Sequence, residues 1–228
     1  VSKAVRTPPV NKSWTAWETV VEFMRFENID DNPQPKDIRI TYSAWGDQAL
    51  RVPHYMDPKL SVAQEPTLVR LPDQRLFCVM RTMSGYIWYS VSSDDGMTWC
   101  SPRPMLRKDH GQPISEPLCC CPLYEYSPGR YVLLHHNNDG HFQGCKREVT
   151  GKNRRPAFIA LGEFRPKADQ PIWFSESKLF MDNDGKGIGP LNRIDIGVYP
   201  SVTNRKGVFV LWHPDRKFFL LEIGRAHV

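Results

Sequence analysis

Short runs of apolar residues, separated by turn residues, divide the chain into predicted β-strands. Three segments follow one plan, in which a strand, a tight turn and a more hydrophobic strand succeed one another. They cover residues 65–81, 116–134 and 199–212. The second strands of the first two segments contain the continuous apolar runs 77–80 and 131–134, a pattern typical of strands buried on both faces.

Further strands complete this pattern. Residues 86–92 and 156–164 predict a third strand after each of the first two segments, and residues 37–43 predict a strand near the start. Residues 14–26 are compatible with a short helix or with a pair of strands. Residues 28–36 predict an ordinary surface loop, whereas the glycine-rich loop 182–197 is a candidate for binding residues, which often lie on loops of a rigid scaffold.

Composition narrows the fold class to all-β. Hydrophobic residues make up 40% of the 228 residues, which is enough for a core, and 20 prolines and 15 glycines interrupt any long helix. The first two segments begin about 50 residues apart, a spacing within the range of β-propeller blades. No apolar run is long enough for a membrane span. The net charge of +5 is spread without a basic block, which disfavours nucleic acid and favours a small acidic ligand.

The six cysteines do not predict a metal site. Their spacing contains no C-x-x-C motif, and they are Cys78, Cys100, Cys119, Cys120, Cys121 and Cys145. Adjacent strand residues point to opposite faces, so Cys119, Cys120 and Cys121 are not expected to converge on one ion. We therefore predict buried cysteines that act as small hydrophobic residues, with no metal and no cofactor.

One motif fixes the register of the first segment. The sequence S-x-D-x-G-x-T-W follows the apolar run 86–91, and its defining residues are Ser92, Asp94, Gly96, Thr98 and Trp99. A short carboxylate can accept hydrogen bonds from backbone N–H groups in a turn, and glycine tolerates positive φ. The motif, called the Asp-box, predicts a structural β-hairpin turn whose Trp99 caps the small core beneath it.

Together with residues 65–82, this motif resembles the BNR-repeat (Asp-box) domain of sialidase-like proteins. The likeness is close over residues 65–104 and weaker through 154–161 and 199–201. The resemblance implies a six-bladed β-propeller, of which this chain has enough sequence for about four blades. Residues 1–222 are then the C-terminal part of one propeller domain. Residues 223–228 match the translation of a widely used sequencing adapter, which predicts read-through in an environmental assembly.

The resemblance also implies a site for a terminal acidic sugar such as sialic acid. In this family, arginines clamp the sugar carboxylate, a tyrosine is the nucleophile, and a glutamate takes the proton of that tyrosine. Carried over by position, Tyr199 is the nucleophile and Glu65 its partner. Arg81 is one clamp residue, and either Arg154 or its neighbour Arg155 is a second.

The sequence departs from this family in two respects. The first clamp arginine of the family lies in an Arg-Ile-Pro motif, which is absent here, and the acid/base aspartate that follows it is expected on a missing N-terminal part. The chain alone is therefore predicted to be inactive. The expected partner is a sialoglycoconjugate or similar acidic glycan, and secretion or a periplasmic location fits such a substrate. The alternatives are a non-catalytic propeller that binds carbohydrate or protein, and a propeller glycosidase for another sugar.

Overall fold

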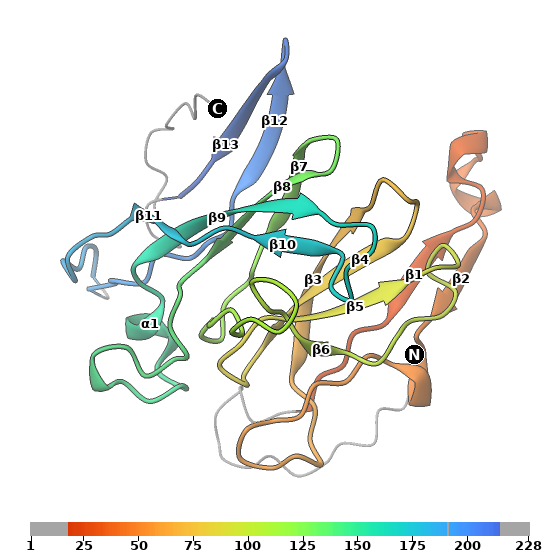
Figure 1. The fold of residues 1–228 in the computed structure, drawn as a ribbon. Helices are drawn as coiled ribbons and strands as arrows, with labels where there is room; N and C mark the ends of the chain where they lie inside the picture. Colours follow the sequence, from red (N-terminus) through yellow and green to blue (C-terminus); the bar gives the residue numbers. More distant parts are fainter. Residues whose placement is uncertain (1–17, 191, 215–228) are drawn as a thin grey trace.

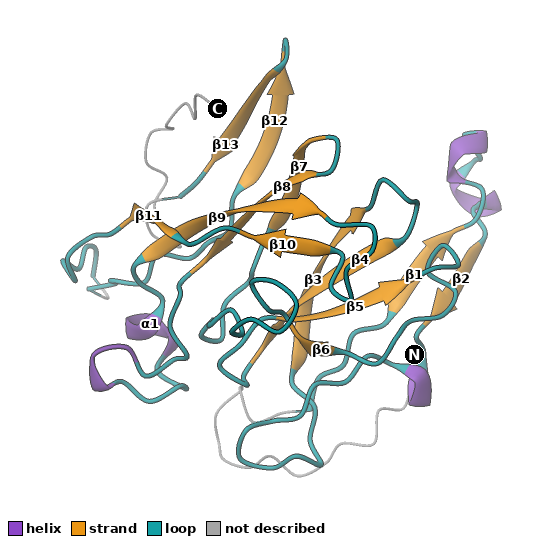
Figure 2. Ribbon diagram, viewed as in Figure 1, coloured by secondary structure: helices purple, strands orange, loops and turns teal. Residues whose placement is uncertain are grey.

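A computed structural model describes residues 18–190 and 192–214 of the chain, and its architecture there is all-β (Figure 2). The strands are β1 (Phe23–Phe26), β2 (Ile40–Ser43), β3 (Ala63–Arg70), β4 (Leu76–Thr82), β5 (Trp88–Ser92), β6 (Arg103–Pro104), β7 (Leu123–Ser127), β8 (Arg130–His135), β9 (Ala157–Phe164), β10 (Ile172–Phe174), β11 (Lys178–Met181), β12 (Ser201–Arg205) and β13 (Val208–Trp212). Helical structure is limited to short pieces, which are α1 (Thr150–Asn153) and the 3-10 turns Ile29–Asp31, Pro35–Asp37, Gly46–Gln48 and Phe142–Gly144. No helix within the described ranges has the length and apolar character needed to cross a membrane.

The strands form antiparallel sheets that follow one another along the chain (Figure 1). The first sheet is β1–β2, and the second has the order β3-β4-β5-β6. In the third sheet β7, β8 and β9 lie in sequence, and both β10 and β11 pair with the outer edge of β9. The fourth sheet is β12–β13. The predicted all-β class is confirmed for the described residues, and their four successive sheets agree in number with the expected four or so blades.

The sheets pack face to face in the order of the sequence. On β4, Phe77 and Val79 belong to the core shared with the third sheet, whereas Cys78 and Met80 belong to the core shared with the first sheet. Strand β8 has the same arrangement, because Leu133 and Leu134 face different cores. The continuous apolar runs of the sequence are therefore strands that are covered on both faces, as predicted.

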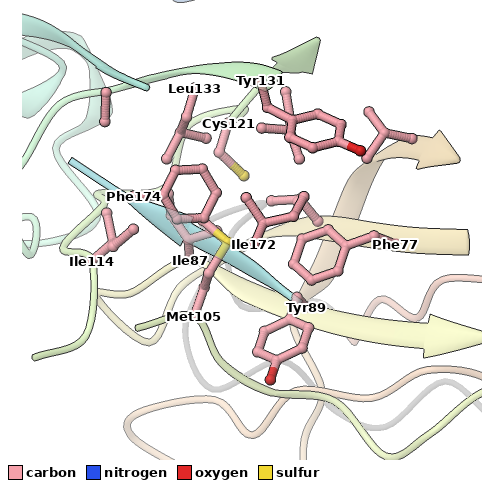
Figure 3. Close-up of a cluster of buried hydrophobic side chains, with 14 of the residues drawn as sticks. Phe77, Ile87, Tyr89, Met105, Ile114, Cys121, Tyr131, Leu133, Ile172 and Phe174 are labelled. Atoms are coloured by element: carbon pink, nitrogen blue, oxygen red, sulfur yellow. The ribbon is translucent and has the colours of Figure 1, made fainter. Parts of the chain in front are cut away.

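The core between the second and third sheets is the largest cluster (Figure 3). Its aromatic residues include Phe77 and Tyr89, whose rings stack with centroids 4.9 Å apart, and Tyr131, which is fully buried. Ile172 and Phe174 of β10 belong to the same cluster and pack into it from the third sheet. This contact joins the two central sheets into one body, on which the candidate site is built.

The sequence expectation for the second segment was wrong in detail. Residues 116–122 are not part of a strand, and β7 begins only at Leu123. Pro117 and Pro122 lack the N–H group that a sheet ladder needs, which explains the irregular segment. In the N-terminal region, where a helix and a pair of strands were both open, the described part of 14–26 forms isolated bridges and strand β1.

Gly162 of β9 lies opposite Phe174 of β10, and its close surroundings lead to a testable prediction. A Cβ atom at this position would lie 2.8 Å from Cγ2 of Ile172 and 3.0 Å from Cε1 of Phe174. Gly162→Ala is therefore expected to reduce the free energy of unfolding by about 1–3 kcal/mol, as measured by chemical denaturation. The neighbouring Leu161 is 50% exposed, so Leu161→Ala serves as the control and should cost roughly 0.5 kcal/mol. Equal losses in the two variants would contradict this account of Gly162.

Candidate functional site

A polar pocket of about 440 Å³ opens where three parts of the chain meet. Strands β3 and β4 form one side, α1 and the residue that follows it form a second, and the segment before β12 forms the third. The lining residues are Gln64, Glu65, Arg81, Thr150, Arg154, Arg193, Asp195 and Tyr199. Three arginines and two carboxylates thus meet in one cavity, which suits a small ligand that carries negative charge.

Arg81 and Glu65 form the β3–β4 side of the pocket. Nη1 of Arg81 lies 2.7 Å from Oε1 of Glu65, and the Arg81 side chain is 4% exposed whereas that of Glu65 is 45% exposed. Glu65 has φ of 41° and sits in the register shift between Gln64 and Thr67 on β3. A bulge redirects a side chain, and a left-handed conformation at a residue other than glycine stores strain, as is common at functional sites.

Arg154 enters the pocket from the loop between α1 and β9. Its side chain is buried, and both Nε and Nη2 donate hydrogen bonds to the carbonyl oxygen of Leu118, at 2.9 and 2.5 Å. Arg155 has a different environment, because its Nε and Nη2 bind the two carboxylate oxygens of Asp182 at 3.0 and 2.9 Å. Of the two neighbours considered for the second clamp position, the structure brings only Arg154 into the pocket.

Tyr199 is held by the segment that precedes β12. Ile196 and Val198 are buried in the core that also contains Leu134 and Ala157, whereas Tyr199 lines the pocket. The backbone is fixed by the N–H of Ile196, which donates to the carbonyl of Arg154 at 2.8 Å, and the hydroxyl of Tyr124 donates to the carbonyl of Pro200 at 2.9 Å. These bonds attach the tyrosine segment directly to the arginine that shares its pocket.

The electrostatics of the pocket keep Tyr199 neutral. Burial raises the pKa of its phenol to about 12, with a further increase from the negative charge of Cys119 and an opposing effect of Arg154. The phenol therefore retains its proton at neutral pH. A reaction that uses Tyr199 as a nucleophile needs a base nearby, and Glu65 lines the same pocket.

Two charged residues of the pocket were not identified from the sequence. Arg193 and Asp195 both lie in the glycine-rich loop 182–197, and Nη1 of Arg193 is 3.7 Å from Oδ1 of the buried Asp195. The loop itself was a candidate for binding residues, but it carries no repeat pattern that would single out these two positions. Arg193 is the third arginine of the pocket.

A buried polar cluster lies next to the pocket. One ligand atom each of Glu116, Cys119 and His136 lies within 4.8 Å of the others. Burial raises the pKa of Glu116 well above its ordinary value, and the negative charge of Cys119 adds to this. Burial also opposes ionisation of Cys119, but a hydrogen bond with Cys120 and the charge of Arg154 outweigh it and hold the pKa of this thiol well below its ordinary value.

The Asp-box lies outside the pocket lining and forms a closed turn after β5. Oδ1 of Asp94 accepts hydrogen bonds from the Ser92 hydroxyl and the Thr98 N–H, both at 2.8 Å, and Gly96 has φ of 85°. The indole N–H of Trp99 donates to the carbonyl of Gly96, and its ring stacks on Phe23 of β1 with centroids 4.4 Å apart. The turn thus connects the first and second sheets.

A pH-dependent effect follows from the hydrogen bonds of Asp94. Those from the Thr98 side chain and backbone, followed by that from Ser92, lower the pKa of the carboxyl from 3.8 to about 2. A lowered pKa in the folded state adds stability above the unfolded value and loses it as the pH falls through the folded value. Asp94→Asn is therefore expected to melt at a lower temperature than the unmodified chain near pH 6, with the difference shrinking between pH 3.8 and about 2. A difference that stays constant over this range would show that the charge is not involved.

Comparisons with known proteins give structural likenesses at low sequence identity. No protein-family model matches the chain, and no curated protein matches it. Among solved structures, NanB in complex with Optactamide is 16% identical with a TM-score of 0.48, and the match covers 78% of this chain and 24% of that one. A mutant of NanB sialidase from Streptococcus pneumoniae is 16% identical with a TM-score of 0.47, and the match again covers 78% of this chain and 24% of that one.

A third match is the intramolecular trans-sialidase from Ruminococcus gnavus in complex with oseltamivir carboxylate. It is 19% identical with a TM-score of 0.43, and the match covers 78% of this chain and 33% of that one. The chain thus spans between 24% and 33% of the length of these three structures. Likeness at this level carries no argument about activity or substrate, for which the pocket itself is the basis.

Proposed function

We propose that the chain is part of a sialidase-like glycoside hydrolase that acts on a terminal acidic sugar with retention of configuration. The observation that carries this proposal is the shared pocket of Glu65, Arg81, Arg154 and Tyr199. Glu65 and Arg81 come from the paired strands β3 and β4, and Arg154 and Tyr199 come from two later segments of the chain. Their types match an anion clamp, a nucleophile and a base.

In the proposed reaction, Arg81 and Arg154 bind the carboxylate of the sugar, and Arg193, which is not one of the clamp residues, adds positive charge to the same pocket. The phenol oxygen of Tyr199 attacks the anomeric carbon while Glu65 accepts its proton. A C–O bond to Tyr199 forms, the glycosidic C–O bond breaks, and the leaving alcohol takes a proton from an acid. Water then releases the sugar in a second displacement on the same carbon, so the configuration is retained.

We further propose that a preceding blade supplies this acid and the remaining clamp residue. The outer face of the first sheet supports the proposal. Met24 and Phe26 on β1 lie opposite Tyr42 and Ile40 on β2, and all four side chains are between 43% and 53% exposed. A contiguous exposed apolar face marks a surface that another element covers. A further sheet packed there would repeat the face-to-face stacking seen between the described sheets.

The anion clamp can be tested on the chain itself by isothermal titration. Sialic acid is expected to bind at least about tenfold more tightly than its methyl ester, because the ester removes the charge that the arginines would bind. Equal affinities would remove the clamp from the proposal. If a protein that includes the proposed preceding blade binds sialic acid but does not turn over a sialoside, the non-catalytic carbohydrate-binding alternative is favoured.

A further inference from the structure

Glu116, Cys119 and His136 are the three members of the buried cluster next to the pocket, and none of them lines that pocket. Glu116 and Cys119 belong to the irregular segment before β7, and His136 directly follows β8. The three side chains are at most 1% exposed. A carboxylate, a thiol and an imidazole so close together in the interior need a common partner or a shared proton.

The imidazole of His136 is oriented by the backbone. Its Nδ1 lies 3.0 Å from the carbonyl oxygen of Pro156, which can only accept, so Nδ1 carries the proton and donates it. Nε2 then retains its lone pair, and it is buried without a hydrogen-bond partner among residues 18–190 and 192–214. A histidine whose second nitrogen donates to a backbone carbonyl has the arrangement that fixes a metal ligand.

Of the two carboxylate oxygens of Glu116, one accepts a hydrogen bond from the described residues and the other does not. Oε2 accepts the backbone N–H of His136 at 2.6 Å. Oε1 is buried and, within the described part of the chain, has no hydrogen-bond partner. Buried polar atoms that lack partners are costly, and two such atoms beside one thiol point to a ligand that both would bind.

We propose that Glu116, Cys119 and His136 form a binding site for a divalent metal ion of the zinc class. Thiolate, imidazole and carboxylate are all ligands of Zn²⁺, and a thiol ligand disfavours Mg²⁺ and Ca²⁺. The negative charges of one thiolate and one carboxylate balance the charge of the ion. Three protein ligands leave one position of a tetrahedral ion for water or another donor.

The ion would fasten the ends of the β7–β8 hairpin to each other. Leu118 lies between two of the ligands, and its carbonyl accepts both hydrogen bonds of Arg154. A bound metal would therefore fix the backbone that positions this arginine. The proposal is independent of the proposed enzymatic activity, since it concerns residues outside the pocket and its test measures metal alone.

The test is titration of the metal-stripped chain with Co²⁺ and Zn²⁺. Co²⁺ is expected to give a thiolate-to-metal charge-transfer band that saturates at about one equivalent, and Zn²⁺ is expected to raise the melting temperature as its concentration increases. Mg²⁺ and Ca²⁺ should do neither. Cys119→Ser should lose the band and weaken Zn²⁺ binding by at least ~100-fold. Cys121→Ser is the matched control, because Cys121 is equally buried but faces the core between the second and third sheets.

A second pair of variants tests the site if Cys119→Ser does not fold. His136→Gln is expected to weaken Zn²⁺ binding at least ~100-fold, whereas His135→Gln, which changes the adjacent buried histidine bonded to Ser177, should retain it. The absence of a cobalt band in the unmodified chain would overturn the proposal. The alternative for the cluster would then be a hydrogen bond in which Cys119 and His136 share a proton. Equal metal uptake by Cys119→Ser and Cys121→Ser would overturn it as well.

Discussion

Tyr199→Phe is expected to lower turnover of a fluorogenic sialoside by at least ~10³-fold in a protein that joins this chain to the proposed preceding blade. The substitution removes the phenol oxygen that would form the bond to the anomeric carbon and leaves the ring in place. Because the hydroxyl is used only in the chemical step, kcat should fall while the affinity for sialic acid changes by no more than about threefold. Steady-state kinetics and titration with sialic acid measure the two effects separately.

Tyr124→Phe is the matched control for this experiment. The Tyr124 hydroxyl donates to the carbonyl of Pro200, next to Tyr199, so its removal loosens the same segment without touching the proposed nucleophile. Turnover by this variant should stay within about tenfold of the unmodified protein, because a single hydrogen bond contributes roughly 1 kcal/mol. If Tyr199→Phe retains full turnover, Tyr199 is not the nucleophile.

The fold could be predicted where burial leaves a clear pattern in the sequence. Strands β4 and β8 are covered on both faces, and their continuous apolar runs identified them as inner strands. The pattern failed for residues 116–122, which are buried but not in a strand. Burial explains their apolar composition, and the prolines at either end exclude the ladder.

The candidate site could be predicted only where it follows the repeat. Glu65 and Arg81 lie at fixed positions in a segment whose register the Asp-box sets, and Tyr199 lies just before β12, the corresponding strand of a later segment. Arg193 and Asp195 lie in a loop with no such register, so their place in the pocket depends on tertiary contacts. Choosing between Arg154 and Arg155 needed the structure, because both lie in the irregular turn between α1 and β9, where no periodicity of the sequence tells which side chain faces the pocket.

The buried cluster of Glu116, Cys119 and His136 could not be recognised from cysteine or histidine spacing motifs. In the β7–β8 hairpin Leu123 pairs with Leu133, and the N–H of Leu134 still donates to the carbonyl of Pro122, so the chain before β7 runs beside the end of β8. Cys119 is therefore close to His136 although the two lie 17 positions apart in the sequence. Local cysteine spacing does not detect a contact that a hairpin creates, whereas the register of the hairpin does.

The environments of Arg154 and Arg155 also provide the most discriminating test of the clamp. Arg154→Met is expected to weaken sialic acid binding by about 30-fold to 1000-fold, equal to ~2–4 kcal/mol, because it removes a buried guanidinium from the pocket. Arg155→Met is the control, since it breaks the pairing with Asp182 outside the pocket. It should lower the melting temperature and leave the affinity unchanged.

Two measurements on each variant separate the roles of the neighbours. Titration with sialic acid gives the affinity, and thermal unfolding shows whether a loss of affinity comes from a loss of structure. Arg154→Lys keeps the charge but not the planar fork, so it should recover only part of the affinity lost by Arg154→Met. If Arg155→Met weakens binding in a folded protein and Arg154→Met does not, the clamp residue is Arg155. The pocket in solution would then differ from the present arrangement, in which the carbonyl of Leu118 holds the Arg154 guanidinium.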